Sequence, residues 1–227
     1  TQAGKGVMLN FIMTQAILRG DAVIFIDPKG SDRMYKAFCR ACEKAGRGKP
    51  LRFHPGNRSK TDGIRFDVTA VFSTGAQIAT RVMSVVPGED NVFKQFAWSC
   101  IKTFADAMIE LGEKPSLKSL SQNINKGIED LLRALILQAV KQHADTDWRE
   151  QAESFLPARR ENCTDAIHEL NVLVSWYENV LPTYLHTMVV SECLKIFHHS
   201  KEHYSKITAT LMPIFAVLTS GPLEESL

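Results

Sequence analysis

Short apolar runs alternate with helically spaced apolar positions over the first 53 residues of the chain. Residues 7–18 and 33–45 carry apolar side chains at helical spacing, whereas residues 22–26 and 51–53 are short apolar runs of strand type. Helices that alternate with such runs are typical of parallel strands connected by crossover helices. This part of the sequence therefore predicts an α/β domain. The Gly-, Pro-, Asn- and Asp-rich stretch that follows, residues 54–67, predicts a loop.

The pattern changes after about residue 72. Apolar side chains then recur at intervals of three and four residues, which marks one face of a helix. This spacing covers residues 93–111, 128–140, 167–181 and 207–218. Helix-breaking residues separate the segments at 112–115, 144–146, 157, 182 and 221–222. Because no strand pattern follows residue 72, the second part of the sequence predicts an all-α domain.

These patterns divide the chain into three expected parts. Residues 1–72 are the N-terminal part of a nucleotide-binding α/β domain, residues 73–220 are the all-α domain, and residues 221–227 start a return to the first domain. A parallel sheet needs more than two or three strands if both of its faces are to be covered. We therefore expect further strands beyond Leu227, so that the helices form an insertion in the sheet.

The chain begins with TQAGKGVMLN, which has the form of the second half of a phosphate-binding loop. In the pattern G-x-x-x-x-G-K-[ST], backbone N–H groups and the start of the next helix cradle phosphate oxygens, and the lysine reaches the β- and γ-phosphates. Gly4 and Lys5 take these places, and only three residues precede them. We therefore expect the sequence to begin inside its own nucleotide site, as a piece of a longer protein. The predicted nucleotide contacts are Thr1, Gln2, Ala3, Gly4, Lys5, Gly6 and Val7.

Position 6 departs from the general loop pattern. A Ser or Thr at this place binds Mg²⁺ through its hydroxyl, and Gly6 has no side chain to do so. A second carboxylate at the end of another apolar strand is also missing from the sequence. We therefore expect this piece not to hydrolyse ATP by itself, and the sequence predicts no catalytic residue within it.

The residues Asp27-Pro28-Lys29-Gly30 follow the apolar run 22–26. Open α/β sheets place ligands at the carboxyl ends of their strands, so Asp27 is a candidate for ordering the loop or a metal-bound water. Lys29 is a candidate for contact with phosphate or DNA. The same four residues are also good turn formers, and both interpretations stay open.

Charge is unevenly distributed along the chain, although its formal net value is only +2. Residues 1–66 hold 13 Lys and Arg against 5 Asp and Glu, while residues 67–227 hold 14 against 20. A basic first part suits anionic ligands such as a triphosphate or a nucleic acid, and it is equally compatible with a solvated surface. No apolar run of about 18 residues is present, so we expect no membrane span in this piece.

Cysteine and histidine patterns do not favour a metal or redox site. Five cysteines without framework spacing fit a reducing cytoplasm, and the C-x-x-C formed by Cys39 and Cys42 has no second pair. His199 and His203 are spaced i, i+4 but lack the H-E-x-x-H pattern, so a solvated helix face is expected there. Core or interface positions are expected for the three tryptophans, Trp98, Trp148 and Trp176.

Four longer segments follow one another along nearly the whole chain: TQAGKGVMLN, RGDAVIFIDPKGSD, VFKQFAWSCIKTFADAMIELGEKPSL and KEHYSKITATLMPIFAVLTSGPL. In this order they resemble the TraD/TraG-type coupling proteins of conjugative type IV secretion, specifically the TraD of integrative conjugative elements. The Gly-Lys-Gly-Val form of the phosphate loop also occurs among coupling proteins.

This resemblance implies a partial RecA-like P-loop domain followed by an inserted all-α domain. It implies a hexamer, anchored in the bacterial inner membrane, that uses ATP and Mg²⁺ to move single-stranded DNA and its relaxase toward the secretion channel. The piece itself would lie on the cytoplasmic face, with the helical domain recognising substrate or secretion components. Gly4 and Lys5 carry over as nucleotide contacts, whereas the Walker B carboxylate, the arginine finger and the membrane anchor have no counterpart within residues 1–227.

Two other interpretations remain open. An FtsK/HerA-type DNA translocase shares the phosphate loop and the strand followed by Asp-Pro-Lys, but it lacks a helical insertion of this kind. A non-catalytic adaptor, in which the helices only dock a relaxosome or secretion protein, is favoured for this piece by Gly6 and by the missing second carboxylate.

Overall fold

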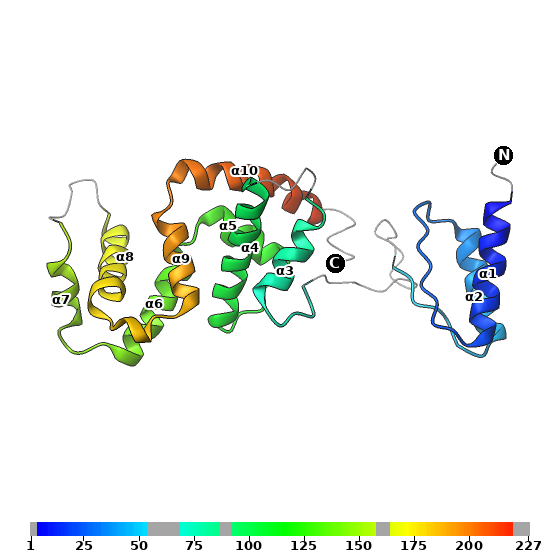
Figure 1. Ribbon diagram of the computed structural model, residues 1–227, viewed down its shortest axis with the longest axis horizontal. Helices are drawn as coiled ribbons and strands as arrows, with labels where there is room; N and C mark the ends of the chain where they lie inside the picture. The colour runs from blue at the N-terminus through cyan, green and yellow to red at the C-terminus, as the bar shows by residue number, and fades with distance from the viewer. Residues whose placement is uncertain (1–3, 54–68, 87–91, 158–163, 220–227) are drawn as a thin grey trace. The chain divides into compact units, whose positions relative to one another are not determined.

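The computed structural model describes residues 4–53, 69–86, 92–157 and 164–219 (Figure 1). Within these ranges the chain forms ten α-helices, one π-helical turn and one 3₁₀ turn, and it forms no β-strand. The chain divides into two compact units, one of Thr1–Phe66 with Pro222–Leu227 and one of Asp67–Gly221. Every helix in the described ranges is too short or too polar to cross a lipid bilayer.

The first unit is built on two helices that pack against each other, α1 (Lys5–Arg19) and α2 (Asp32–Lys44). Both helices were expected from the apolar spacing, and both predictions are confirmed. Gly20 ends α1 in the left-handed region at φ 94°, where a glycine has no steric penalty. The core of the unit is formed by Met13, Ile17, Ala41 and Cys42.

The segment 22–26 between these helices is not a strand. Val23 and Phe25 pack against the core of the unit, whereas Ile24 and Ile26 are 92% and 82% exposed. A strand exists only as part of a hydrogen-bonded ladder, and no described segment forms one with these residues. The apolar run was predicted to be a buried strand. In the structure it is irregular, and only Val23 and Phe25 pack against the core.

The predicted α/β fold class is therefore wrong for the described residues, which include no RecA-like sheet. Residues 51–53, predicted as a second strand, are also irregular, and Leu51 is 81% exposed. The physical reason is that short apolar runs meet the compositional requirement for a strand without supplying a neighbour to pair with. The loop predicted over residues 54–67 lies outside the described residues.

Helix α4 (Val92–Glu110) is the centre of the second unit. It contacts α3 (Gly75–Met83), α5 (Leu117–Lys126) and α10 (Lys201–Leu218), and Figure 1 shows these helices grouped around it. Its buried face carries eight residues. The enclosed side chains of α4 and α10 include Ile101, Phe104, Met108, Leu211 and Phe215.

The remaining helices of the second unit pack against one another. Helix α6 (Glu129–His143) contacts α4 and so connects this group to it. Helix α7 (Trp148–Ser154) packs against α8 (Asp165–Ser175), which continues directly into the π-helical turn Trp176–Val180. Pro182 follows that turn, and the short 3₁₀ turn Thr183–Leu185 leads into α9 (Met188–His198). Helix α9 contacts both α4 and α6, so it connects the two groups of helices.

The four helices predicted after residue 72 are confirmed as α4, α6, α8 and α10. The predicted breaks at residues 112–115, 144–146, 157 and 182 all lie between helical elements, whereas 221–222 lies outside the described residues. Sequence spacing missed α3, α5, α7 and α9; α3, α5 and α7 have ten residues or fewer, whereas α9 is as long as α8. Pro213 lies inside α10.

Candidate functional site

The candidate phosphate contacts lie at the start of α1. Gly4 is the N-cap residue, at φ −104° and ψ −22°, and its carbonyl accepts a hydrogen bond from the Met8 N–H at 3.0 Å. Among the described residues no side chain caps this end of the helix, and its first turn carries no acidic residue. Lys5 and Gly6 follow, and both are exposed. The N–H groups of the first turn thus have no side-chain oxygen of their own helix as acceptor.

Gly4 and Gly6 leave this end of α1 sterically open. A Cβ atom added at either glycine would meet no atom within 4 Å, so packing in the described structure does not require glycine there. The partial positive charge of a helix N-terminus, its unsatisfied N–H groups and a lysine are the components of an anion site. The arrangement is chemically able to bind a phosphate group.

Asp27 organises the turn that leads into α2. One carboxylate oxygen accepts the backbone N–H of Lys29 at 3.0 Å, and the other accepts that of Ser31 at 2.7 Å. Ser31 is in turn the N-cap of α2 and accepts from the Met34 N–H. These contacts belong to the turn interpretation of Asp27. Lys29 is exposed, and its contact with phosphate or DNA stays a prediction.

The predicted site residues are only partly brought together. Gly4, Lys5, Gly6 and Val7 are consecutive at the start of α1, whereas Thr1, Gln2 and Ala3 lie outside the described residues. The hydrogen bonds and ion pairs of the described residues include none between Lys5 and Asp27 or Lys29. Gly6 has no side-chain oxygen, so it does not supply the hydroxyl that binds Mg²⁺ in the general loop.

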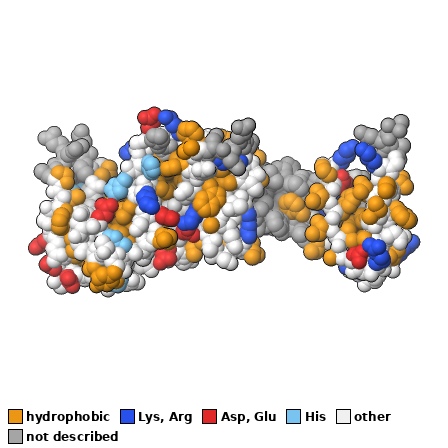
Figure 2. Space-filling view, in the orientation of Figure 1, with side chains coloured by type: hydrophobic (Ala, Val, Ile, Leu, Met, Phe, Trp, Pro, Cys, Tyr) orange, Lys and Arg blue, Asp and Glu red, His pale blue; other side chains and the backbone are white. Residues whose placement is uncertain are grey.

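Helix α1 also exposes a large apolar surface. Val7, Met8 and Phe11 are more than 60% exposed, although the helix buries Met13 and Ile17 against α2. Figure 2 shows apolar side chains over much of the visible face of this unit. Helix α1 therefore carries apolar side chains on its exposed side as well as on its buried side. Because such a helix is normally buried on both sides, the exposed side of α1 is suited to contact with another protein surface.

The histidines around the end of α9 take part in protein contacts. His198 Nε2 lies 2.9 Å from the Glu178 carboxylate, and the ring of His199 packs edge-on against Phe96 with centroids 4.8 Å apart. The side chain of His203 lies outside the described residues. No group of three or more metal-binding side chains gathers within the described part of the chain.

The described cysteines are free thiols. Cys39 and Cys42 lie one turn apart on α2, and burial is the main cause that raises the pKa of Cys42. In the second unit burial raises the pKa of Cys100 to about 12. Burial and, to a smaller extent, the charges of Glu192 and Asp106 raise the pKa of Cys193 to about 12. A thiol with a raised pKa is protonated near neutral pH and is a weak nucleophile.

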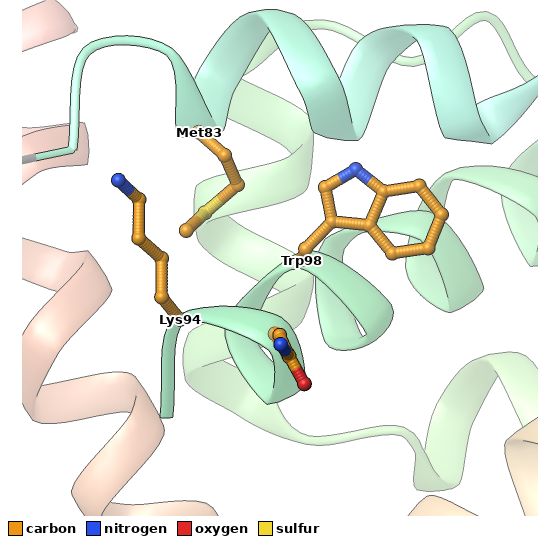
Figure 3. Close-up of a pocket in the computed structure, with 4 residues that line it drawn as sticks. Met83, Lys94 and Trp98 are labelled. Carbon is orange, nitrogen blue, oxygen red and sulfur yellow. The ribbon is translucent and has the colours of Figure 1, made fainter. Parts of the chain in front are cut away.

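The three tryptophans have different environments. Trp176 is 2% exposed and packs edge-on against Trp148, with ring centroids 6.1 Å apart, as expected for core positions. Trp98 is half-buried and lines a hollow between α3 and α4, together with Met83, Lys94 and Gln95 (Figure 3). The sequence alone did not separate Trp98 from the other two.

An ionic network in the second unit was also missed by the sequence. Lys102 Nζ lies 2.9 Å from Asp106 on the same helix and 2.7 Å from Glu192 on α9. Asp106 also accepts the Gly75 N–H at 2.8 Å. Burial alone would lower the pKa of Lys102, but the hydrogen bonds and charges of Glu192 and Asp106 outweigh burial and raise it. The i, i+4 spacing of Lys102 and Asp106 was a visible signal, whereas nothing in the sequence pointed to Glu192.

Comparison with known proteins adds no assignment to this geometry. The chain matches no protein-family model, no curated protein and no solved structure. Its function is therefore argued from its own residues.

Proposed function

We propose that this chain is part of a coupling protein that links a relaxase–DNA complex to a type IV secretion channel and uses ATP to drive DNA transfer. The observation that carries the proposal is the uncapped, non-acidic start of α1, at which Gly4 and Lys5 stand in the order of a phosphate loop. The four sequence segments that resemble TraD/TraG-type proteins support it. They cover both units of the chain.

In this proposal the start of α1 binds the nucleotide phosphates. The N–H groups of residues 5–7 face an open end of the helix, and Lys5 contributes a mobile positive charge beside them. Because Gly6 supplies no hydroxyl, any Mg²⁺ that accompanies ATP needs oxygen ligands from elsewhere, such as the phosphates themselves. A hexameric arrangement would let a neighbouring subunit supply further charge to the phosphates.

The second unit has the docking role in this proposal. Helices α3, α5, α6, α9 and α10 all contact α4, and the unit has a core of enclosed aliphatic and aromatic side chains that can support a surface for protein recognition. The acidic excess after residue 66 disfavours binding of the DNA backbone to this unit. We therefore assign the DNA contact to the basic first unit and the protein contact to the helical unit.

A non-catalytic docking module is the second candidate function. It is favoured by Gly6, which lacks the metal-binding hydroxyl, and by the larger share of the chain that forms the helical unit. This candidate keeps the relaxosome or secretion protein as partner and removes the ATP requirement. The two candidates therefore differ in whether Lys5 is needed for DNA transfer.

The experiment that tests the coupling role is an in-frame deletion of the encoding gene in donor cells that carry the mobile element. We expect conjugative transfer to be lost and to return when the gene is supplied in trans. Relaxase cleavage at the transfer origin, measured in the same cells, should continue, because a coupling protein acts after the DNA is processed. Normal transfer in the deletion strain would reject both candidates. Loss of relaxase cleavage would place the chain in DNA processing instead.

A further inference from the structure

Helix α2 carries a basic row on its outer face, made up of Arg33, Lys36, Arg40 and Lys44. All four side chains belong to exposed residues. Their spacing of three, four and four residues confines them to about a quarter of the helix circumference. The row extends about 16 Å along the helix axis, at a rise of about 1.5 Å per residue. Another side of the helix packs against α1 through Ala41 and Cys42, so the row faces away from the core of the unit.

The charges of the basic row are not compensated within the described part of the chain. The ion pairs formed by the described residues include none with any of its four members. Two nearby aspartates are engaged with other cations. Asp21 lies 2.7 Å from Arg19, and the second aspartate, Asp32, lies 3.2 Å from Arg52. Glu43 is exposed on the same helix and offsets one charge, so the row keeps a positive balance.

The length of the basic row indicates what kind of anion it suits. A single phosphate or carboxylate would reach only one or two of the four cations, because they are spread over about 16 Å. One strand of a DNA duplex carries a phosphate about every 3.4 Å of helix axis, so a similar length presents about five of them. The row therefore suits a line of phosphates better than an isolated anion.

The side chains of α2 offer no exposed aromatic surface on which a base could stack. Its two aromatic residues, Tyr35 and Phe38, are partly buried, and Phe38 packs against the core of the unit. Proteins that bind single strands combine basic side chains with aromatic stacking platforms. A duplex keeps its bases stacked inside and presents its phosphates, which basic side chains contact without reading the sequence. The composition of this face of α2 therefore favours a double strand.

An anionic membrane is the other extended polyanion to consider. A basic amphipathic helix binds such a membrane by placing its apolar side among the lipid chains. In α2 that side is already occupied, because Ala41 and Cys42 are buried together with Met13 and Ile17 of α1. Insertion of α2 would require the two helices of the first unit to separate. Contact with a duplex requires no such change.

We propose that the basic row of α2 binds the phosphate backbone of double-stranded DNA without regard to base sequence. This surface deepens the DNA contact assigned above to the first unit, and its biological role rests on that proposed function. None of its four side chains is among the predicted nucleotide contacts, so the row and Lys5 are separately testable. The binding itself is a property of the chain alone.

The test is fluorescence anisotropy of a labelled duplex of arbitrary sequence, titrated with the purified 227-residue chain. Four phosphate contacts predict that the affinity falls about a hundredfold when the salt concentration rises from about 50 to about 200 mM. The double variant Lys36→Gln with Arg40→Gln should bind at least about tenfold more weakly at the lower salt concentration. Its affinity should fall only about tenfold over the same range. Glutamine is a good helix former, so α2 should persist in this variant.

Two further variants separate the basic row from total charge. Lys126→Gln with Lys141→Gln is the matched control, because it removes the same charge from exposed positions of the helical unit. Lys36→Arg with Arg40→Lys keeps both charges of the row in place. Both of these variants should bind the duplex like the wild type. A single strand of the same length should bind the wild type at least about fivefold more weakly, since its phosphates release fewer counterions.

Four results would overturn the proposal. These are no measurable binding of the duplex, an equal loss in the matched control, equal affinity for the single strand, and binding to vesicles of phosphatidylglycerol and phosphatidylcholine that depends on the basic row while the duplex does not bind. The outcome is separable from that of the gene deletion. Normal transfer with row-dependent duplex binding rejects only the conjugative role, whereas lost transfer without duplex binding rejects only this surface.

Discussion

Lys102 Nζ donates to the Glu192 carboxylate at 2.7 Å and thereby connects α4 to α9 across 90 residues of sequence. The same ammonium lies 2.9 Å from Asp106, so it stands between two carboxylates that would otherwise repel each other. All three side chains are less than a third exposed. The network joins the group of helices around α4 to the helix that contacts α6.

Replacing Lys102 by Met should destabilise the helical unit by about 1–3 kcal/mol, because two partly buried carboxylates lose their shared counter-charge. The measurement is urea unfolding followed by circular dichroism. Lys206→Met is the matched control, since Lys206 also pairs with a carboxylate at i, i+4 spacing but is 55% exposed. That variant should lose less than about 0.5 kcal/mol. Equal losses in the two variants would show that Lys102 has no special role.

Gly75→Ala should also destabilise the helical unit. A Cβ atom at Gly75 would lie 2.4 Å from the Asp106 carboxylate and 2.8 Å from the Lys102 carbonyl oxygen. Because one of these is backbone, relief requires α3 to move away from α4, and we expect a loss of about 1–3 kcal/mol in urea unfolding. Gly6→Ala is the contrasting variant: it meets no atom within 4 Å and should leave stability unchanged or raise it. A neutral Gly75→Ala would contradict the described packing of α3 on α4.

The sequence predicted the helices better than the sheet, and particular residues show why. Apolar positions 128–140 face one side of a helix, and that periodicity specifies α6 without knowledge of any other segment. The run 22–26 specifies only an apolar, extended segment; whether it becomes a strand depends on a partner, which the described residues do not supply. Lys102 and Glu192 likewise meet only through the tertiary packing of α4 and α9, which no local pattern encodes.

In the candidate site, too, the local pattern identified some residues, whereas the contacts of others depend on the folded chain. Gly4 and Lys5 were identified from a short pattern, and the structure places them at an open helix start, as the order of the pattern required. Asp27 was ambiguous in the sequence because the same residue type serves a ligand site and a turn. Its two contacts with backbone N–H groups become visible only when the turn is folded. Trp98 is half-buried whereas Trp176 is enclosed, a difference that a helical spacing pattern does not reveal.

Tyr204→Phe should cost about 1–2 kcal/mol of unfolding free energy. The Tyr204 hydroxyl on α10 donates to the Ile124 carbonyl oxygen in the last turn of α5. Carbonyl groups in the last turn of a helix have no partner within the helix, so removal of the hydroxyl leaves this one unsatisfied. Tyr184→Phe, at an 83% exposed position, should be neutral in the same urea experiment. An unchanged midpoint for Tyr204→Phe would mean that water replaces the hydroxyl without loss.

The helical unit should lose stability at alkaline pH. The pKa values of Cys100 and Cys193 are raised to about 12 in the folded chain, whereas unfolded thiols ionise near 9.0. Between these values the unfolded state releases protons that the folded state keeps, so the free energy of unfolding falls as pH rises above 9. The slope should be about 1.4 kcal/mol per pH unit for each thiol. Lys102 acts in the same direction, since its pKa is raised above 10.5 and its contribution is lost as pH rises through the folded value.

Urea unfolding at pH 8, 9.5 and 10.5 measures this slope. The double variant Cys100→Ala with Cys193→Ala serves as the control, because it removes both titrating thiols while Lys102 remains. We expect a shallower slope for the variant between pH 9.5 and 10.5, whatever its stability at pH 8. Parallel curves for the two proteins would contradict the assignment of the alkaline loss to buried thiols.

The most direct test of the proposed function is the frequency of conjugative transfer from donor cells in which Lys5 is replaced by Ala in the encoded protein. If Lys5 binds the phosphates as proposed, removal of its charge should lower transfer by about a hundredfold or more. Lys141→Ala, at an exposed lysine of α6 in the helical unit, should transfer like the wild type. Equal transfer by the Lys5→Ala and wild-type donors, at equal protein levels, would contradict a nucleotide-driven role and leave the helical docking function.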